Sequence, residues 1–217
     1  MKVWAFCSQK GGVGKTTIAL NVAVLAEQQG LVTAVLDCDP QSNCVRWGKE
    51  RGTREPMVFA TAPEKLRDTV EAARTLNVDL CLIDAASKLD AALLAAVACA
   101  DRIVTPTRGG LLNIDSLEAT AKLLEMAGRL QDAVAVVNDV EPGKVNSTVG
   151  EARAVLERLN FPLCPVHLCH RAHFEKAINA GKGVTESNSQ SQAADELRDL
   201  WAALNQMAAG KKPKKVT

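Results

Sequence analysis

Short apolar runs alternate along this chain with longer segments in which apolar residues recur at helical spacing. The runs cover residues 3–7, 32–37, 57–62, 78–84, 101–106 and 133–139. The longer segments cover residues 15–29, 63–76, 89–98, 113–130 and 145–159. A short apolar run predicts a buried strand, and a helical period predicts a helix. The alternation therefore predicts an α/β fold with a mostly parallel, twisted sheet.

Two of the predicted strands, residues 78–83 and 133–137, are almost continuously apolar. Strands are continuously apolar when both faces of the sheet are covered, so we expect helices on both faces. Ligands of such sheets bind at the carboxyl ends of the strands. Residues that follow the apolar runs are therefore the first candidates for function.

Composition limits the architecture to one domain. The chain has 217 residues, of which 47% are hydrophobic, and its formal net charge is +1. We expect a single domain over residues 1–209 and a short basic tail over residues 210–217. The tail contains Lys211, Lys212, Lys214 and Lys215, and it either is simply solvated or contacts a partner.

Cellular location is indicated by what the sequence lacks. It has no run of about 18 apolar residues that could span a bilayer, and polar Ser8, Gln9 and Lys10 stand where a signal peptide needs its apolar core. The seven cysteines show no spacing typical of disulfides or a zinc site, so we expect reduced, mostly buried thiols. Both features predict a cytoplasmic protein.

The most informative segment runs from Ser8 to Thr17, between the first predicted strand and the first long helix. Its core is Gly11, Gly12, Val13, Gly14, Lys15, Thr16 and Thr17. Glycines let successive backbone N–H groups point at phosphate oxygens, and the helix N-terminus adds its positive dipole end. Lys15 can reach the terminal phosphates, and the Thr16 hydroxyl can bind Mg²⁺. The segment predicts an ATP-binding loop.

This loop departs from the ordinary phosphate-loop pattern, because Gln9 stands where that pattern requires glycine. With Lys10 before the glycine pair, it resembles the deviant Walker A motif of the ParA and MinD family of dimeric ATPases, which have a P-loop NTPase fold. The resemblance implies that Lys10 reaches across an ATP-dependent homodimer to the partner's nucleotide. It also implies slow ATP hydrolysis, to which Lys10 and Lys15 contribute.

Three aspartates follow two of the predicted strands. Asp37 ends the run 32–37 and Asp39 follows it, while Asp84 ends the run 78–84. Carboxylates at this edge can bind hydrated Mg²⁺ and orient a water for in-line attack on the terminal phosphoryl group. The family resemblance assigns the water to Asp39 and the metal to Asp37 and Asp84. Helix capping is the alternative for any one of them, and three together favour the metal site.

The chain differs from the family after Asp84, where it reads Ala85-Ala86-Ser87 instead of continuing toward prolines. The predicted strand 133–137 is followed by Asn138, whose amide can both donate to and accept from adenine. The resemblance assigns Asn138 to the base. A turn formed by Asn138 and Asp139 is the alternative.

All three histidines lie in residues 165–174, together with Cys169. Their spacing matches no standard zinc pattern. The segment instead resembles the family pattern Arg-x-x-Phe-x-x-Ala…Gly-x-x-Val-x-Glu, which frames the nucleotide edge. The matching residues here are Arg171, Phe174, Ala177, Gly181, Val184 and Glu186.

The resemblance implies a molecular switch whose ATP-bound dimer binds nonspecific DNA on the nucleoid. A ParB-like or centromere-binding adaptor would stimulate hydrolysis, and the cycle would partition a plasmid or chromosome. DNA binding requires Lys and Arg contacts with phosphates, and the candidates are Arg171, Lys176, Lys182 and the tail lysines. A related alternative is an ATPase that positions a protein cargo such as carboxysomes.

Two other classes are disfavoured. A MinD-like membrane ATPase could use the apolar stripe formed by Leu197, Leu200, Trp201, Leu204 and Met207, but such a stripe is more often a core helix. A small-molecule enzyme such as dethiobiotin synthetase or the nitrogenase iron protein could use the same loop. The sequence shows no convincing biotin-precursor site, and Cys81 and Cys99 lie in apolar segments rather than at a cluster position.

Overall fold

The protein is a parallel α/β sheet covered by helices. A computed structural model describes residues 1–53, 55–87, 91–109 and 111–210, with the backbone alone for 111–114. The described strands are β1 (Lys2–Phe6), β2 (Thr33–Asp37), β3 (Met57–Ala60), β4 (Leu80–Asp84), β5 (Arg102–Thr107) and β6 (Ala133–Val137). They form one sheet in the order β3-β2-β4-β1-β5-β6, and every pairing is parallel. The predicted fold class is confirmed.

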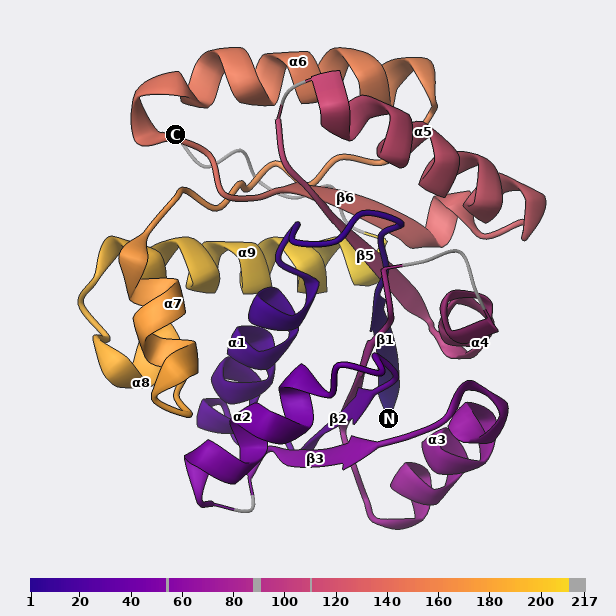
Figure 1. Cartoon of the computed structure of the whole chain (residues 1–217), viewed down its shortest axis with the longest axis vertical. Helices are drawn as coiled ribbons and strands as arrows, with labels where there is room; N and C mark the ends of the chain where they lie inside the picture. Colours follow the sequence, from indigo (N-terminus) through magenta and orange to yellow (C-terminus); the bar gives the residue numbers. More distant parts are fainter. Residues whose placement is uncertain (54, 88–90, 110, 211–217) are drawn as a thin grey trace.

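Helices lie on both faces of this sheet (Figure 1). One face carries α1 (Lys15–Gln28), α2 (Asn43–Arg51), α7 (Ala172–Asn179), α8 (Val184–Ser187) and α9 (Gln192–Ala208). The other carries α3 (Leu66–Thr75), α4 (Ala91–Cys99), α5 (Leu111–Met126) and α6 (Val145–Arg158). Alternate residues of β1 show the reason, since Val3 and Ala5 pack against the second set and Trp4 and Phe6 against the first.

The predicted helix ends shift where local chemistry intervenes. The segment expected over 63–76 begins as a 3₁₀ turn at Pro63–Lys65, since Pro63 occupies the first helical position. The segment expected over 113–130 ends at Met126, because Gly128 adopts a left-handed conformation with φ of 67°. The start of the segment expected at 89–98 and the tail lysines 211–215 lie outside the described residues.

The apolar stripe near the C-terminus lies on the helix α9. Leu197, Leu200 and Leu204 are fully buried, and the rings of Trp201 and Trp4 lie 5.4 Å apart. The stripe therefore belongs to the core, which removes the feature that suggested membrane attachment. Within the described ranges, no helix combines the length and apolarity needed to cross a bilayer.

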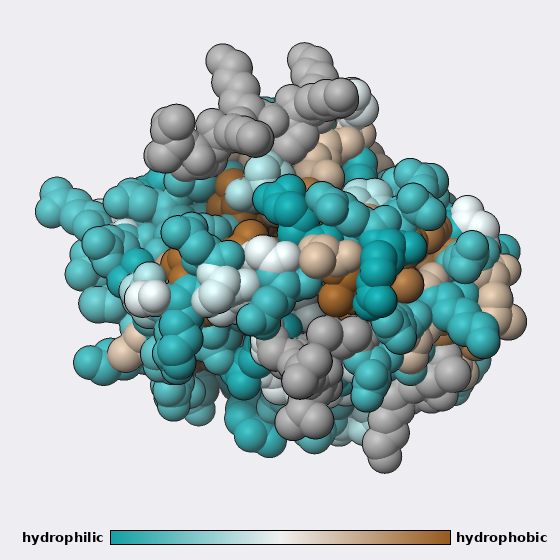
Figure 2. Space-filling model, turned by 90° about the horizontal axis from the view of Figure 1, so that it is seen from above, coloured by the Kyte–Doolittle hydropathy of each residue, from teal (hydrophilic) through white to brown (hydrophobic). Residues whose placement is uncertain are grey.

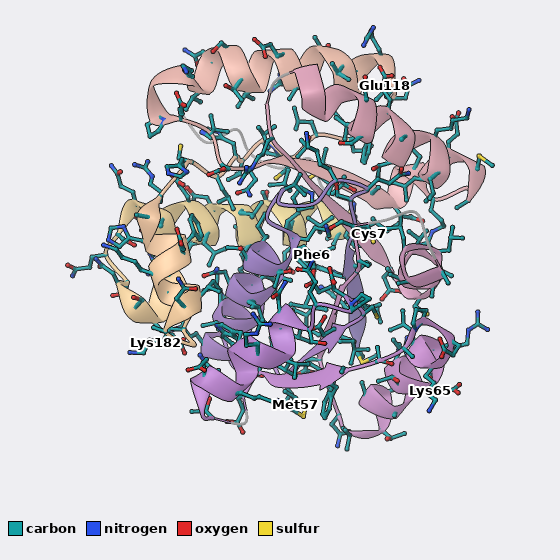
Figure 3. All side chains as sticks on the ribbon, viewed as in Figure 1. Phe6, Cys7, Met57, Lys65, Glu118 and Lys182 are labelled. Carbon is teal, nitrogen blue, oxygen red and sulfur yellow. The ribbon has the colours of Figure 1, made fainter. Side chains whose placement is uncertain are left out.

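The face in Figure 2 is mostly hydrophilic, and its apolar residues are seen in recesses between polar side chains. In Figure 3, Phe6 and Cys7 lie near the centre of the molecule, where β1 ends, whereas the charged Lys65, Glu118 and Lys182 lie toward the periphery. All seven cysteines are free, and all but Cys99 are buried, as expected.

Strand register positions the functional edge. Asp37 at the end of β2 and Phe6 at the end of β1 both align with Asp84 at the end of β4. The segment that follows β1 therefore begins beside two buried carboxylates. Parallel pairing alone brings together residues that lie 47 positions apart in the sequence, Asp37 and Asp84.

Candidate functional site

The predicted phosphate loop connects β1 to α1. Gly12 and Gly14 have φ of 74° and 98°, values that glycine adopts without the steric cost of a side chain. A β-carbon at Gly14 would collide with the amide of Asn138, which donates to the Val13 carbonyl at 2.8 Å. The N-terminus of α1 has no side-chain cap and no acidic residue in its first turn. Its backbone amides and its dipole are therefore available to an anion.

Lys15 lies at the start of α1 and is only 5% exposed. Its Nζ donates to Ser87 Oγ at 2.5 Å and to the Lys10 carbonyl at 3.3 Å. Burial lowers the pKa of Lys15, and the charges of Asp84 and Asp39 oppose that effect. Among the described residues, no carboxylate lies within ion-pairing distance of this ammonium. A buried cation in this state is an electrostatic site for an anion such as phosphate.

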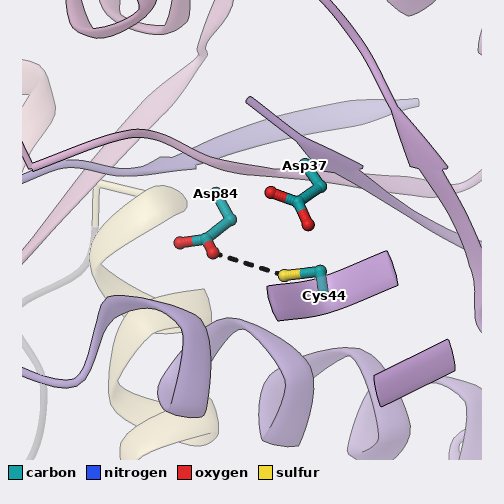
Figure 4. Close-up of side chains that lie close together, drawn as sticks. All are labelled: Asp37, Cys44 and Asp84. Carbon is teal, nitrogen blue, oxygen red and sulfur yellow. Dashed lines mark hydrogen bonds between the residues drawn. The ribbon is translucent and has the colours of Figure 1, made fainter. Parts of the chain in front are cut away.

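Asp84 faces the other side of the same loop. Its Oδ2 accepts from the Thr16 hydroxyl at 2.6 Å and from the Cys44 thiol at 3.3 Å, whereas its buried Oδ1 has no partner in the described part of the chain. Figure 4 shows Asp37, Cys44 and Asp84 together. Their ligand atoms lie within 4.8 Å of one another.

These donors fit the predicted magnesium ion. The Thr16 hydroxyl and the carboxylates of Asp37 and Asp84 are hard oxygen ligands, which Mg²⁺ prefers. Asp84 Oδ1 is buried without a hydrogen-bond partner in the described part of the chain, so the cost of removing it from water is not offset there. Desolvation by burial raises the pKa of Asp84 to about 6, although the hydrogen bonds from Thr16 and Cys44 oppose the shift. A cation here would offset the cost of keeping this buried carboxylate ionised.

Asp37 also performs the capping role that was its alternative. Its Oδ2 accepts from the backbone N–H of Val45 at 3.1 Å, in the first turn of α2, and its Oδ1 accepts from that of Asp39 at 3.1 Å. Burial raises the pKa of Asp37, and these hydrogen bonds oppose the change. Capping and metal support are compatible, because a carboxylate has about four acceptor positions.

Most of the predicted residues meet in one cavity of about 610 Å³. From the predicted set it is lined by Gly11, Gly12, Gly14, Lys15, Thr16, Thr17, Asp39 and Asn138. Asp39 is half-buried there, and its Oδ1 accepts from the Gln41 N–H at 2.9 Å. Val13 is buried, and Lys10 contributes its carbonyl to Lys15. The reach of the Lys10 side chain across a dimer stays a prediction.

The cavity also contains residues that the sequence did not single out as nucleotide contacts. At one end Asp139, with φ of 61°, pairs with Arg108 at 2.6 Å and with His170 at 2.6 Å. These residues come from three separate segments, so no local pattern predicts their meeting. Cys44 was missed because α2 was not predicted, being short and largely polar.

The segment expected to frame the nucleotide divides into two parts. Arg171 and Phe174 line the cavity, and Arg171 is paired with Glu196 at 2.8 Å. The second part packs against α2, where Glu186 pairs with Arg51 at 2.7 Å. A β-carbon at Gly181 would meet the backbone of Arg51. Of the candidate DNA contacts, Lys176 and Lys182 are exposed, whereas Arg171 is already paired.

Comparison with known proteins gives one matching family model. Residues 4–184 match the CobQ/CobB/MinD/ParA nucleotide binding domain. The chain is 30% identical over 211 residues to "Maintenance of carboxysome distribution protein A" of Gloeobacter kilaueensis, covering 92% of this chain and 95% of the relative. It is 27% identical over 206 residues to the protein of the same name from Halothiobacillus neapolitanus, covering 90% and 93%.

Solved structures share the fold. A chain of the MinC:MinD cell division protein complex of Aquifex aeolicus has a TM-score of 0.78 at 17% identity, with 100% of this chain and 99% of that chain covered. An ATP complex of McdA from Cyanothece has a TM-score of 0.67 at 20% identity, with the same coverage. These similarities support the α/β architecture described above.

Replacement of Asp84 by Asn should stabilise the nucleotide-free, metal-free protein at neutral pH. Because burial raises the Asp84 pKa from 3.8 to about 6, ionisation opposes folding above pH 6. The folded protein takes up the proton first as pH falls, so this cost disappears between about pH 6 and pH 4. We expect Asp84→Asn to be more stable by about 3 kcal/mol at pH 7.5, with the difference shrinking through that window.

Urea unfolding in a chelating buffer at several pH values measures this difference. Asp68→Asn replaces an exposed carboxylate of α3, is the matched control and should change stability by less than about 0.5 kcal/mol. A less stable Asp84→Asn protein at pH 7.5 would show that the carboxylate is not a source of strain.

Proposed function

Because this chain belongs to the CobQ/CobB/MinD/ParA family of nucleotide-binding proteins, we propose that it is an ATPase that positions a protein cargo of the carboxysome kind. The proposed ATPase activity is supported by the cavity in which Lys15 and Thr16 lie beside Asp84. The proposed kind of cargo is supported by two relatives named for carboxysome distribution, each matched over at least 90% of this chain.

The chemistry follows from the residues at the strand edge. The backbone amides at the start of α1 hold the inner phosphates, and the Lys15 ammonium neutralises the outer ones. Thr16, Asp84 and Asp37 would hold Mg²⁺, which would supply neutralising charge for the triphosphate. Asp39 accepts a proton from, or orients, the attacking water, because it is a half-buried carboxylate in the cavity, whereas Asp139 in the same cavity is paired with Arg108. Asn138 contacts the base as well as the loop.

The cycle that we propose couples ATP to assembly. ATP brings two copies together with Lys10 reaching across to the partner's nucleotide, and the dimer binds nonspecific DNA on the nucleoid in the cytoplasm. A cargo-bound adaptor stimulates hydrolysis and releases the ATPase locally. Basal turnover is slow, so the adaptor sets the lifetime of the DNA-bound state.

Partition of a plasmid or chromosome, with a ParB-like adaptor, is the second candidate. It is supported by "Chromosome-partitioning ATPase Soj" of Thermus thermophilus, which is 29% identical over 150 residues and covers 56% of this chain and 60% of the relative. The carboxysome-distribution relatives extend over much more of both chains. We therefore place the protein cargo first and DNA partition second.

Lys15→Gln should weaken ATP binding by at least about 100-fold, because it removes charge-assisted contacts with phosphate. Isothermal calorimetry with Mg²⁺ and a non-hydrolysable ATP analogue measures the affinity. Lys65→Gln removes an exposed lysine on the 3₁₀ turn before α3 and should bind normally. Equal binding by the wild type and Lys15→Gln would contradict the assignment of the loop.

Asp39→Ala should retain ATP and lower the hydrolysis rate by about 100-fold or more, which keeps the protein on DNA. Cosedimentation of the ATP-loaded variant with nonspecific DNA should weaken steeply as salt rises. Asp68→Ala is the surface control and should hydrolyse ATP normally. Normal hydrolysis by Asp39→Ala would exclude a role of Asp39 in hydrolysis. Binding of the ATP-loaded protein to liposomes but not to DNA would show that a membrane, not DNA, is the surface to which it binds.

Deletion of the gene in its source organism tests the cargo. We expect protein compartments to lose their even spacing while plasmids and chromosomes are inherited normally. Complementation with the wild type, but not with Lys15→Gln, should restore the spacing. Plasmid loss with normally spaced compartments would favour the second candidate.

A further inference from the structure

Ser87 is a polar group in the cavity that the mechanism above does not use. It lies three residues after Asp84, in the segment that follows β4, and its side chain is half-buried. Ser87 Oγ is 2.5 Å from Lys15 Nζ, and a β-carbon added at Gly11 would lie 3.9 Å from the same oxygen. The hydroxyl is thus placed between the first glycine of the loop and the head of its lysine.

The direction of this hydrogen bond leaves Ser87 with an unused donor. The Lys15 ammonium can only donate, so Ser87 Oγ must be the acceptor. A serine hydroxyl carries one hydrogen of its own, and no residue within the described ranges accepts it. Ser87 lines the cavity, so an acceptor brought by a ligand can reach this hydrogen.

The position of Ser87 along the nucleotide follows from its contact with Lys15. Backbone amides at the start of the helix hold the inner phosphates of a nucleotide, and the lysine side chain reaches the outer ones. Ser87 contacts the end of the lysine side chain rather than the helix amides. The neighbouring carboxylate, Asp84, is the one that binds the Thr16 hydroxyl on the metal side of the cavity.

We propose that Ser87 recognises the terminal phosphoryl group of ATP and thereby distinguishes ATP from ADP. This inference rests on the proposed ATPase function. Before nucleotide binds, the Ser87 oxygen holds the Lys15 ammonium in place, and when ATP binds the hydroxyl donates to an oxygen of the γ-phosphate. ADP leaves that donor without its acceptor, so the contact favours the triphosphate.

Calorimetry with ADP and with a non-hydrolysable ATP analogue tests the inference. Ser87→Ala should weaken binding of the ATP analogue about ten-fold and change binding of ADP by less than about two-fold, because only the γ-phosphate loses a hydrogen bond. Ser87→Thr keeps the hydroxyl and should retain the wild-type ratio. Ser147→Ala removes a serine hydroxyl from α6 and should change neither affinity.

The outcomes separate the inference from the function on which it rests. An unchanged ratio of the two affinities in Ser87→Ala, or tighter binding of both ligands, would overturn it, the second by showing that Ser87 competes with phosphate for Lys15. Ser87→Gly repeats the test if the alanine variant unfolds in a thermal melt. A wild type that binds neither nucleotide would contradict the ATPase itself, whereas loss of selectivity alone leaves it intact.

Discussion

Burial of opposite charges without pairing them is the constraint on which this site depends. The Lys15 ammonium and the Asp84 carboxylate are both nearly inaccessible to water, and each is held by neutral groups, Ser87 and Thr16. Burial shifts both pKa values toward the neutral forms. A ligand that brings phosphate to one and a cation to the other would relieve both costs together. The geometry suits a magnesium nucleotide better than either ion alone.

The helix α2 connects this site to the C-terminal part of the chain. Its first turn donates to Asp37 and places Cys44 against Asp84, while its last residue, Arg51, pairs with Glu186 and lies over the Trp47 ring at 5.1 Å. Arg51 also donates to the Gly181 carbonyl at 3.1 Å. Through these contacts, α2 joins the segment around Gly181 and Glu186 to the two carboxylates of the site.

The comparisons favour a protein cargo over plasmid or chromosome partition, and both proposals use the same nucleotide chemistry. Both proposed functions use the same nucleotide site, so the residues at the strand edge do not distinguish them. In the cycle that we propose, the choice of cargo is therefore set by surfaces outside the nucleotide site. Relatives matched along nearly the whole chain are informative about such surfaces, because a nucleotide site alone would be shared by the entire family.

The sequence by itself determined the strands, the long helices and the phosphate loop, because apolar periodicity and the run from Gly11 to Thr16 are local patterns. It also anticipated that strand-end aspartates meet, since parallel strands bring their carboxyl ends to one edge. Only the tertiary structure decided that Asp37 caps α2, that Cys44 binds Asp84 and that Ser87 holds Lys15. Those contacts join segments separated by 8, 40 and 72 residues, and no local pattern records how such segments pack.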